Sequence, residues 1–199
     1  MLDKYRQKAD KFLEPFAGKI DIKPTFLTYL SLLFAIFAGI FSFFSYNIKY
    51  FLILSAIFII INGFLDALDG KIARMRGEAS KKGDFIDHAI DRFSDVFIIG
   101  GIALSPWINK SIGIITLSCI LLVSYLGTQA QAVGYKRIYA GILGRADRIL
   151  ILFFSLIIQF FVRNLILGFH FLEWVFIYFI VASIVTIIQR YYLTIKVIK

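Results

Sequence analysis

The sequence predicts an all-α, polytopic membrane protein with six transmembrane helices and an interfacial amphipathic helix at the N-terminus. Apolar residues make up 59% of the 199-residue chain, whereas roughly 45–50% is usual in soluble domains. Apolar runs of about 20 residues recur along the whole chain, and a helix of that length crosses a bilayer core of about 30 Å. Basic residues, which give the net charge of +9, gather in alternate segments between these runs.

Residues 1–24 interleave apolar and basic side chains before the first apolar run. Phe12 and Phe16 alternate with lysines such as Lys8, a pattern typical of a helix that lies in the membrane interface. The segment carries too much charge, and the following run is too long, for a cleaved signal peptide. We therefore expect residues 1–24 to form a juxtamembrane segment and residues 25–199 to form one six-span domain.

Six apolar runs define the expected spans. They lie near residues 25–46, 51–74, 85–107, 111–133, 148–168 and 172–194. Eighteen of the 22 lysines and arginines fall in the N-terminal segment, around the polar links after the second and fourth runs, and at the C-terminus. The positive-inside rule places these segments in the cytoplasm. The basic charge is thus a signal of topology in the cell membrane, with both termini cytoplasmic, and it does not indicate a nucleic-acid partner.

Four aspartates stand at the cytoplasmic edge of the second and third runs, in the stretch DALDGKIARMRGEASKKGDFIDHAID. Asp66 and Asp69 share one helix face because they are three residues apart, and Asp87 and Asp91 share another because they are four apart. Carboxylates brought together disfavour one another's ionisation. A divalent cation relieves this repulsion, and carboxylate ligands suit Mg²⁺ or Mn²⁺ better than zinc or copper. We expect a site for Mg²⁺ or Mn²⁺ here, with two ions.

Small and basic residues accompany the acids. Gly70 and Ala73 leave room on the helix for a ligand, Gly83 lets the chain turn, and Arg74 offers a planar fork suited to phosphate. A structural role for the acids, as favourable charges at helix starts, does not account for Asp66, which lies near a helix end. A metal and an arginine at a membrane edge indicate a phosphorylated substrate with a lipid tail.

The pattern Asp66-x2-Asp69-Gly70-x2-Ala73-Arg74-x8-Gly83-x3-Asp87-x3-Asp91 resembles the signature of the CDP-alcohol phosphatidyltransferases at eight positions. That family moves a phosphatidyl-type group from a CDP-linked lipid to an alcohol and releases CMP. The resemblance implies that the four aspartates bind the metal and that Asp91 is also the general base. It implies that five residues contact the CDP-lipid: Gly70, Ala73, Arg74, Ser80 and Gly83. It also implies a homodimer.

Arginines near the fifth and sixth runs bear on the acceptor alcohol. Arg145 and Arg148, in GRADR, and Arg190 enter the membrane from the side of the metal site, which suits a second phosphate; alternatively they snorkel to the surface and set topology. The opening PTFLTYLSLLFAIFAG, with SY and GRADR, resembles the family branch that uses inositol 1-phosphate. This resemblance implies an acceptor-phosphate pocket of Ser124, Arg145, Arg148 and Arg190. Residues 127–129 depart from the basic stretch usual in bacterial members, so glycerol phosphate, serine and other alcohols stay open.

The sequence thus predicts an enzyme that transfers the lipid group of CDP-archaeol or CDP-diacylglycerol to inositol 1-phosphate. Its expected partners are the CDP-linked lipid, the phosphorylated alcohol, membrane lipid and a second copy of the chain. A cation channel or transporter is the rival from another class, but its acids should be spread through the membrane depth. An intramembrane prenyltransferase should have two separated Asp motifs and more spans.

Overall fold

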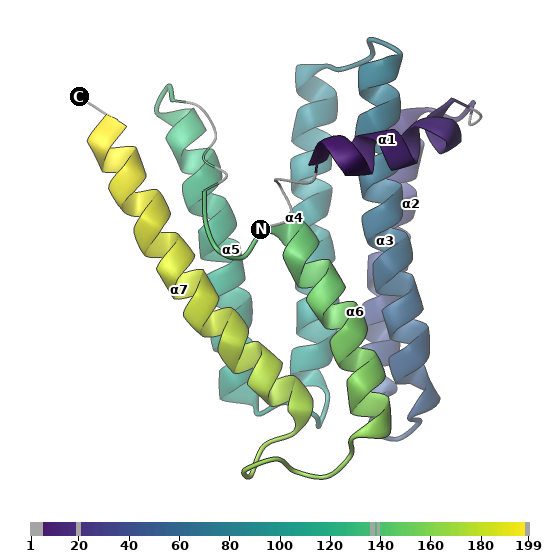
Figure 1. Cartoon of the computed structure of the whole chain (residues 1–199), viewed down its shortest axis with the longest axis vertical. Coiled ribbons are helices and arrows are strands. Elements are labelled where there is room, and N and C mark those ends of the chain that lie inside the picture. Colours follow the sequence, from purple (N-terminus) through teal and green to yellow (C-terminus); the bar gives the residue numbers. More distant parts are fainter. Residues whose placement is uncertain (1–5, 19–20, 136–137, 139, 198–199) are drawn as a thin grey trace.

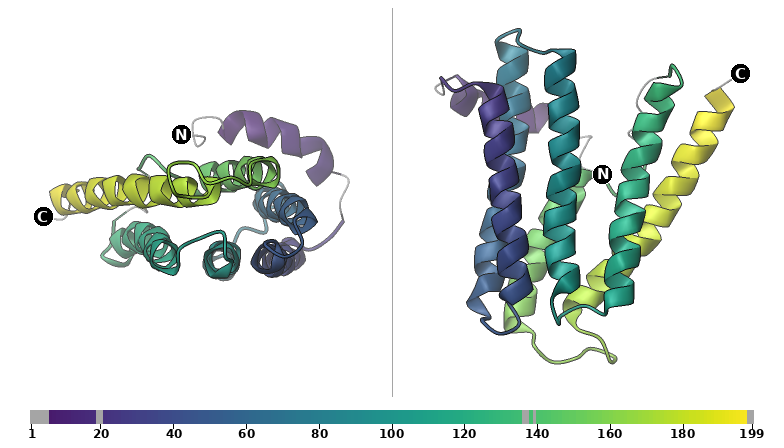
Figure 2. Two further views of the ribbon diagram at one scale, coloured as in Figure 1. Left: turned by 90° about the horizontal axis from the view of Figure 1, so that it is seen from below. Right: turned by 180° about the vertical axis from the view of Figure 1, so that it is seen from behind.

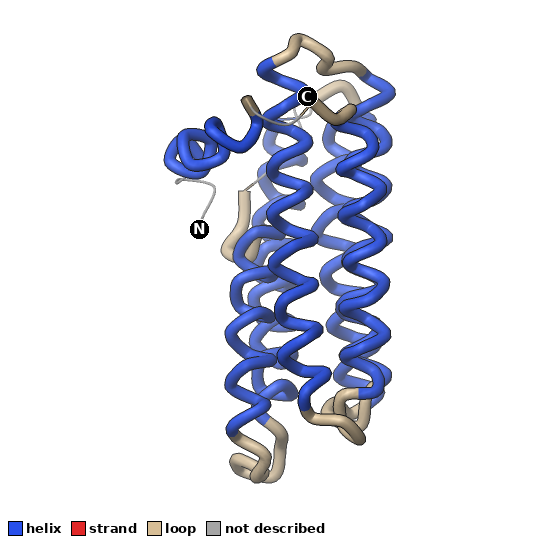
Figure 3. Tube along the Cα trace, turned by 90° about the vertical axis from the view of Figure 1, so that its right-hand side faces the viewer, coloured by secondary structure: helices blue, strands red, loops and turns tan. Residues whose placement is uncertain are grey.

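The computed structural model describes residues 6–18, 21–135, 138 and 140–197, and this part of the chain is all-α. The helices are α1 (Arg6–Ala17), α2 (Pro24–Phe44), α3 (Tyr50–Met75), α4 (Lys81–Leu104), α5 (Lys110–Ala132), α6 (Arg145–Phe161) and α7 (Phe171–Val197). Figure 1 shows α2 to α7 running roughly along one axis, with α1 lying across them. Most of the connecting turns gather at the two ends of the bundle, whereas the segment just before α6 lies part-way down it (Figures 1 and 3). The all-α prediction is confirmed for the described residues.

Four helices are long and apolar enough to cross a membrane: α2, α3, α5 and the Phe171–Lys196 part of α7. The chain is therefore an integral membrane protein. Helices α4 and α6 run alongside these four (Figures 1 and 2). However, α4 carries charged residues in its first half, and the 17 residues of α6 extend only about 25 Å at 1.5 Å per residue. The count of six spans thus stays a prediction.

The fifth expected span, 148–168, ends earlier than predicted. Helix α6 stops at Phe161, just before Arg163 and Asn164, which interrupt the apolar run. Gln159 also holds this end: its Nε2 donates to the Val162 carbonyl at 2.7 Å, and its Oε1 accepts from Leu172 N at 3.0 Å. The side chain thereby ties the end of α6 to the start of α7. The other helices agree with the expected spans to within about one turn at each end.

Helices α2, α3 and α4 form a closely packed unit. A Cβ added to Gly39 of α2 or to Gly101 of α4 would collide with the backbone of the other helix, so these glycines permit the close crossing. Asn62 of α3 is buried and donates from Nδ2 to the Ser31 carbonyl of α2 at 2.9 Å. This unit fixes the end of α3 relative to the start of α4, which is where the four aspartates lie.

Helices α5 and α7 pack on each other. They diverge from α4 toward the end of the bundle that carries the α3–α4 link (Figures 1 and 2). At the opposite end they meet the rest of the bundle. There Glu173 of α7 accepts from Asn109 N at 3.0 Å, and Trp107 Nε1 donates to Ser45 Oγ at 2.9 Å. The chain is therefore tied together at the end far from the aspartates.

Helix α1 lies on the outside of α3 (Figure 1). Leu13 and Ala17 are buried in one cluster with Leu68 and Ile72 of α3, so one face of α1 packs on protein. Phe12 is 64% exposed. The side chains of residues 6–11 lie outside the described part of the chain, and the interfacial amphipathic character of α1 stays a prediction.

Candidate active site

A pocket of about 440 Å³ opens where the start of α2, the end of α3 and the start of α4 come together. All five residues predicted to contact the CDP-lipid line it, namely Gly70, Ala73, Arg74, Ser80 and Gly83. Asp69 and Asp87 line the same pocket. Seven of the site residues predicted from the sequence therefore share one cavity.

Local sequence shapes the edge of this pocket. Helix α3 ends at Met75, and Gly77 follows with a φ of +68°, a conformation that glycine adopts without strain. Ser80 then caps α4: its side-chain oxygen accepts from Gly83 N at 3.1 Å. The turn and the cap place the N-terminus of α4 at the rim of the pocket, where its free N–H groups favour an anion.

Asp69 is held by a residue of α2 that the sequence did not single out. Thr28 Oγ1 donates to Asp69 Oδ2 at 2.6 Å, and the same hydroxyl lies 3.1 Å from the Pro24 carbonyl. Asp69 is only 4% exposed. The hydroxyl fixes the direction of the buried carboxylate, and with Thr25 it adds the start of α2 to the pocket wall.

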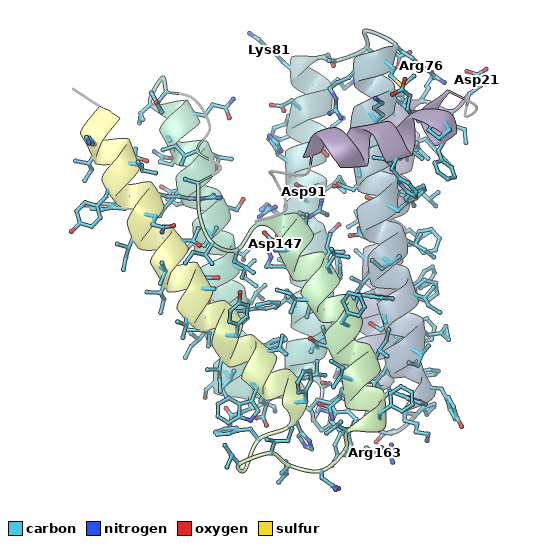
Figure 4. All side chains as sticks on the ribbon, in the orientation of Figure 1. Asp21, Arg76, Lys81, Asp91, Asp147 and Arg163 are labelled. Carbon is cyan, nitrogen blue, oxygen red and sulfur yellow. The ribbon has the colours of Figure 1, made fainter. Side chains whose placement is uncertain are left out.

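Asp66 and Asp91 are not among the residues that line the pocket and instead face the start of α6. Arg145 Nη1 lies 2.5 Å from Asp66 Oδ2 and also pairs with Asp91. In Figure 4, Asp91 on α4 lies near the first turn of α6, where Asp147 is labelled. The guanidinium of Arg145 thus stands between two of the four predicted metal ligands, and its charge offsets their mutual repulsion.

The donor atoms at this site fit a hard divalent cation. Asp87, His88 and Asp91 each offer a ligand atom, and these atoms lie within 4.8 Å of one another. Asp66 Oδ1 is buried and has no hydrogen-bond partner among the residues that the structure describes, so it is available as a ligand. A set dominated by carboxylate oxygens suits Mg²⁺ or Mn²⁺.

Arg148, predicted to bind the acceptor phosphate, is buried and forms an ion pair. Its Nη2 donates to both oxygens of Asp95, at 3.1 and 2.9 Å. Arg92 Nη1 lies 3.0 Å from Asp95 Oδ2. Arg148 is only 4% exposed, so its guanidinium lies among protein groups. Our sequence analysis did not include Asp95, although it follows Asp91 by one helical turn on the same face.

Ser124 and Arg190 lie on the other helix pair. Arg190 Nε donates to the Ala140 carbonyl at 2.8 Å and Nη1 donates to the Val123 carbonyl at 2.5 Å. A Cβ on Gly127 would lie 2.6 Å from Arg190 Nη1, so glycine makes room for this arginine. Ser124, the neighbour of Val123 on α5, is also buried. The four predicted acceptor residues therefore fall in two groups, one beside α3 and α4 and the other between α5 and α7.

Comparison with known proteins identifies the family that the chain resembles. The family model for CDP-alcohol phosphatidyltransferase matches residues 22–188. The archaetidylinositol phosphate synthase of Pyrococcus horikoshii is 36% identical over 158 residues, which cover 78% of this chain and 81% of that protein. The archaetidylinositol phosphate synthase of Methanothermobacter thermautotrophicus is 32% identical over 152 residues, which cover 76% and 75%.

Solved structures show the same fold. The phosphatidylinositol phosphate synthase of Mycobacterium tuberculosis with CDP-DAG bound gives a TM-score of 0.74 at 22% identity, over 92% of this chain and 94% of that one. The same enzyme in complex with manganese and citrate also gives 0.74 at 22% identity, over 92% and 88%. The family model covers most of the chain, and the signature residues line one pocket or flank it. The chain therefore belongs to the CDP-alcohol phosphatidyltransferase family.

Proposed function

We propose that this enzyme transfers the lipid-phosphate group of a CDP-linked lipid to inositol 1-phosphate and releases CMP. The observation that carries the proposal is the placement of Arg145 and Arg148 beside the aspartates that flank the pocket: Arg145 pairs with Asp66 and Asp91, and the buried Arg148 lies one turn further along α6. Metal ligands alone would suit the donor. Two guanidiniums next to them suit an acceptor that carries its own phosphate.

The pocket supplies groups for the CDP part of the donor. Gly70 and Gly83 keep side chains out of it, and Arg74 and Ser80 add a guanidinium and a hydroxyl to its lining. The N-terminus of α4 adds backbone N–H groups that favour phosphate. A volume of about 440 Å³ falls within the roughly 300–1,000 Å³ common for small-molecule sites.

Asp66, Asp69, Asp87 and Asp91 would hold Mg²⁺ or Mn²⁺, as one ion or two. The buried Asp66 Oδ1 and the cluster around Asp87 and Asp91 support this assignment, as does the manganese complex of the tuberculosis relative. When bound, a divalent cation neutralises phosphoryl oxygens and the charge that develops on the departing CMP.

Asp91 is proposed as the general base. Its side chain is 13% exposed and lies beside Arg145, so it is close to the guanidiniums proposed to hold the acceptor. The acceptor hydroxyl oxygen forms a bond to the lipid-bearing phosphorus, and its proton passes to Asp91. The bond from that phosphorus to the CMP oxygen breaks, and CMP leaves with the electron pair.

The relatives support the acceptor and the donor. Two of them are archaetidylinositol phosphate synthases, which favours inositol 1-phosphate as the acceptor and an archaeol-type lipid as the donor. CDP-diacylglycerol is the alternative donor. The distribution of basic residues favours cytoplasmic termini and a cytoplasmic pocket, and we propose a homodimer as the working assembly.

The test is CMP release by the purified protein with Mg²⁺ and either CDP-archaeol or CDP-diacylglycerol. The acceptor panel is inositol 1-phosphate, free inositol, glycerol 3-phosphate and serine. We expect release with inositol 1-phosphate and little with free inositol, because the buried arginines need a phosphate. Equal release with inositol or serine would refute the phosphorylated acceptor. Failure of both release and CDP-lipid binding would refute the transferase site.

A further inference from the structure

Asp95 is a buried carboxylate on α4 that the proposed reaction does not use. It lies one turn beyond Asp91, toward the middle of the helix, and its side chain is 9% exposed. Two arginines surround it. Arg148 Nη2 lies 3.1 and 2.9 Å from its two oxygens, and Arg92 Nη1 lies 3.0 Å from Oδ2.

Within α4, Asp95 forms an i,i+3 ion pair with Arg92, and such pairs contribute only modestly to helix stability. Charged side chains inside a membrane protein are costly to bury and usually serve a site. Replacing a buried ion pair by well-packed apolar residues is often neutral or stabilising, so stability alone gives little reason for Asp95. Its oxygens are occupied by arginine, so we do not assign Asp95 to the metal.

The contacts of Asp95 instead hold the side chain of Arg148. A guanidinium carries its donors in a rigid planar fork. Both oxygens of Asp95 accept from Nη2 of Arg148, so Asp95 holds the guanidinium by this nitrogen. Across residues 6–18, 21–135, 138 and 140–197, the buried Nε of Arg148 has no hydrogen-bond partner. A buried donor without a partner is costly, so this orphaned N–H indicates an anion.

The other charges around Asp95 agree with this interpretation. Arg92 lies between Asp95 and Asp91, with Nη2 at 3.6 Å from Asp91 Oδ2. Asp95 is therefore paired with both arginines, and Arg92 is shared between Asp91 and Asp95.

We infer that Asp95 is a positioning residue that anchors Nη2 of Arg148 and thereby directs its Nε toward the phosphate of the acceptor alcohol. This inference rests on the proposed function, because it assigns the acceptor phosphate to Arg148. Asp95 itself touches neither substrate. It acts on the reaction only through the arginine.

The test compares four variants with the wild-type enzyme: Asp95→Asn, Asp95→Glu, Arg148→Gln and the double variant D95N/R148Q. The readouts are KM for inositol 1-phosphate, KM for the CDP-lipid, kcat and the melting temperature. We expect Asp95→Asn to raise the acceptor KM at least about tenfold, the scale of a lost charge-assisted hydrogen bond. The donor KM should change by less than about twofold, and the double variant should match Arg148→Gln alone.

Glu173→Gln is the matched control. Glu173 is another buried carboxylate, 8% exposed, and it holds the backbone N–H groups of Asn109 and His170 at the far end of the bundle. Its replacement should lower the melting temperature and leave both KM values unchanged. This control separates loss of a buried carboxylate in general from loss of Asp95.

Several outcomes would overturn the inference. One is an equal rise of both KM values in Asp95→Asn, and another is a double variant whose acceptor KM is the product of the two single effects. If Asp95→Asn does not fold, Asp95→Glu provides the test. This variant keeps the negative charge but displaces the carboxylate that holds Arg148 by one methylene, so it should still raise the acceptor KM. Unchanged values there would refute the inference. If Arg148→Gln leaves the acceptor KM unchanged, the acceptor pocket of the proposed function fails as well.

Discussion

The hydroxyl of Thr28 donates to Asp69 Oδ2 at 2.6 Å, and so the first turns of α2 control a predicted metal ligand on α3. Hydrogen bonds to ligating carboxylates orient them, and loss of such a bond typically lowers metal affinity or activity roughly 10–100-fold. We expect Thr28→Val, which keeps the shape but removes the hydroxyl, to shift the Mg²⁺ activation curve by a factor in this range. Thr28→Ser keeps the donor and should stay near wild type. Superimposable activation curves for all three proteins would show that Thr28 does not orient Asp69.

Removal of the proposed base should separate catalysis from donor binding. General-base groups typically contribute roughly 10²–10⁴-fold to a rate, so Asp91→Asn should lower kcat by at least that much. Asp91 is not among the residues that line the pocket, so the residues predicted to contact the donor stay in place. CDP-lipid affinity, measured by ligand-induced thermal shift, should therefore change little. Turnover close to wild type would exclude Asp91 as the base.

Metal binding should appear as stability independent of turnover. A ligand that binds only the folded protein stabilises it by about 2.7 kcal/mol when present at 100 times its Kd. We expect Mn²⁺ to raise the melting temperature of the wild-type protein and a chelator to reverse the rise. In Asp66→Asn the rise should be much smaller, since Asp66 Oδ1 is a buried oxygen that offers a free ligand position. An identical rise in both proteins would place the ion elsewhere.

The crossing of α2 and α4 should tolerate no side chain at Gly39. A Cβ there would collide with the backbone of Phe97, and overpacking of this kind costs about 1–3 kcal/mol or more. Gly39→Ala should lower the melting temperature and weaken activity with both substrates. Gly100→Ala is the control on α4, because a Cβ at Gly100 would meet no described atom within 4 Å. Alanine has the higher helix propensity, so Gly100→Ala should not be destabilised by the substitution itself, and a fall of similar size in both variants would exclude the crossing as the cause.

Gly127 should affect acceptor binding because it leaves room for the Arg190 side chain. A Cβ at this position would lie 2.6 Å from Arg190 Nη1 and 3.0 Å from the Ile138 carbonyl, so Gly127→Ala should displace the guanidinium. If Arg190 binds the acceptor phosphate, the KM for inositol 1-phosphate should rise about tenfold, as for a lost charged hydrogen bond, with little change for the donor. Equal changes for both substrates would assign Arg190 a structural role, through its bonds to the Ala140 and Val123 carbonyls.

Short-range spacing explains what the sequence predicted well. The eight signature residues span the end of α3 and the start of α4, two helices joined by a short link. Their relative placement follows from helix periodicity and one turn. The pocket that contains Gly70, Ala73, Arg74, Ser80 and Gly83 was therefore predictable as a group, and so were the long apolar helices.

Contacts between distant helices explain what the sequence did not predict. The partner of Asp69 comes from α2, 41 residues earlier, and the partner of Arg148 lies 53 residues earlier on α4. Neither pairing produces a recognisable pattern of residues within a single helix, because the two partners lie on different helices. The bond from Leu172 N, at the start of α7, to Gln159 near the end of α6 is likewise not visible in the local sequence. For Arg148, burial argues against the snorkelling alternative, since the residue is only 4% exposed; acceptor binding stays a prediction.

The ion pairs of Arg145 with Asp66 and Asp91 bear on the order in which metal and acceptor bind. Asp66, Asp91 and Asp95 face Arg92, Arg145 and Arg148 in chains of close contacts, so these six charges sum to zero. Asp69 and Asp87, the other two predicted metal ligands, line the pocket outside this set and add two negative charges. A dication offsets these two charges, whereas a phosphate that arrives first adds to them, and this difference is large in a medium of low dielectric constant. The metal should therefore bind before the acceptor, and each should lower the dissociation constant of the other by the same factor.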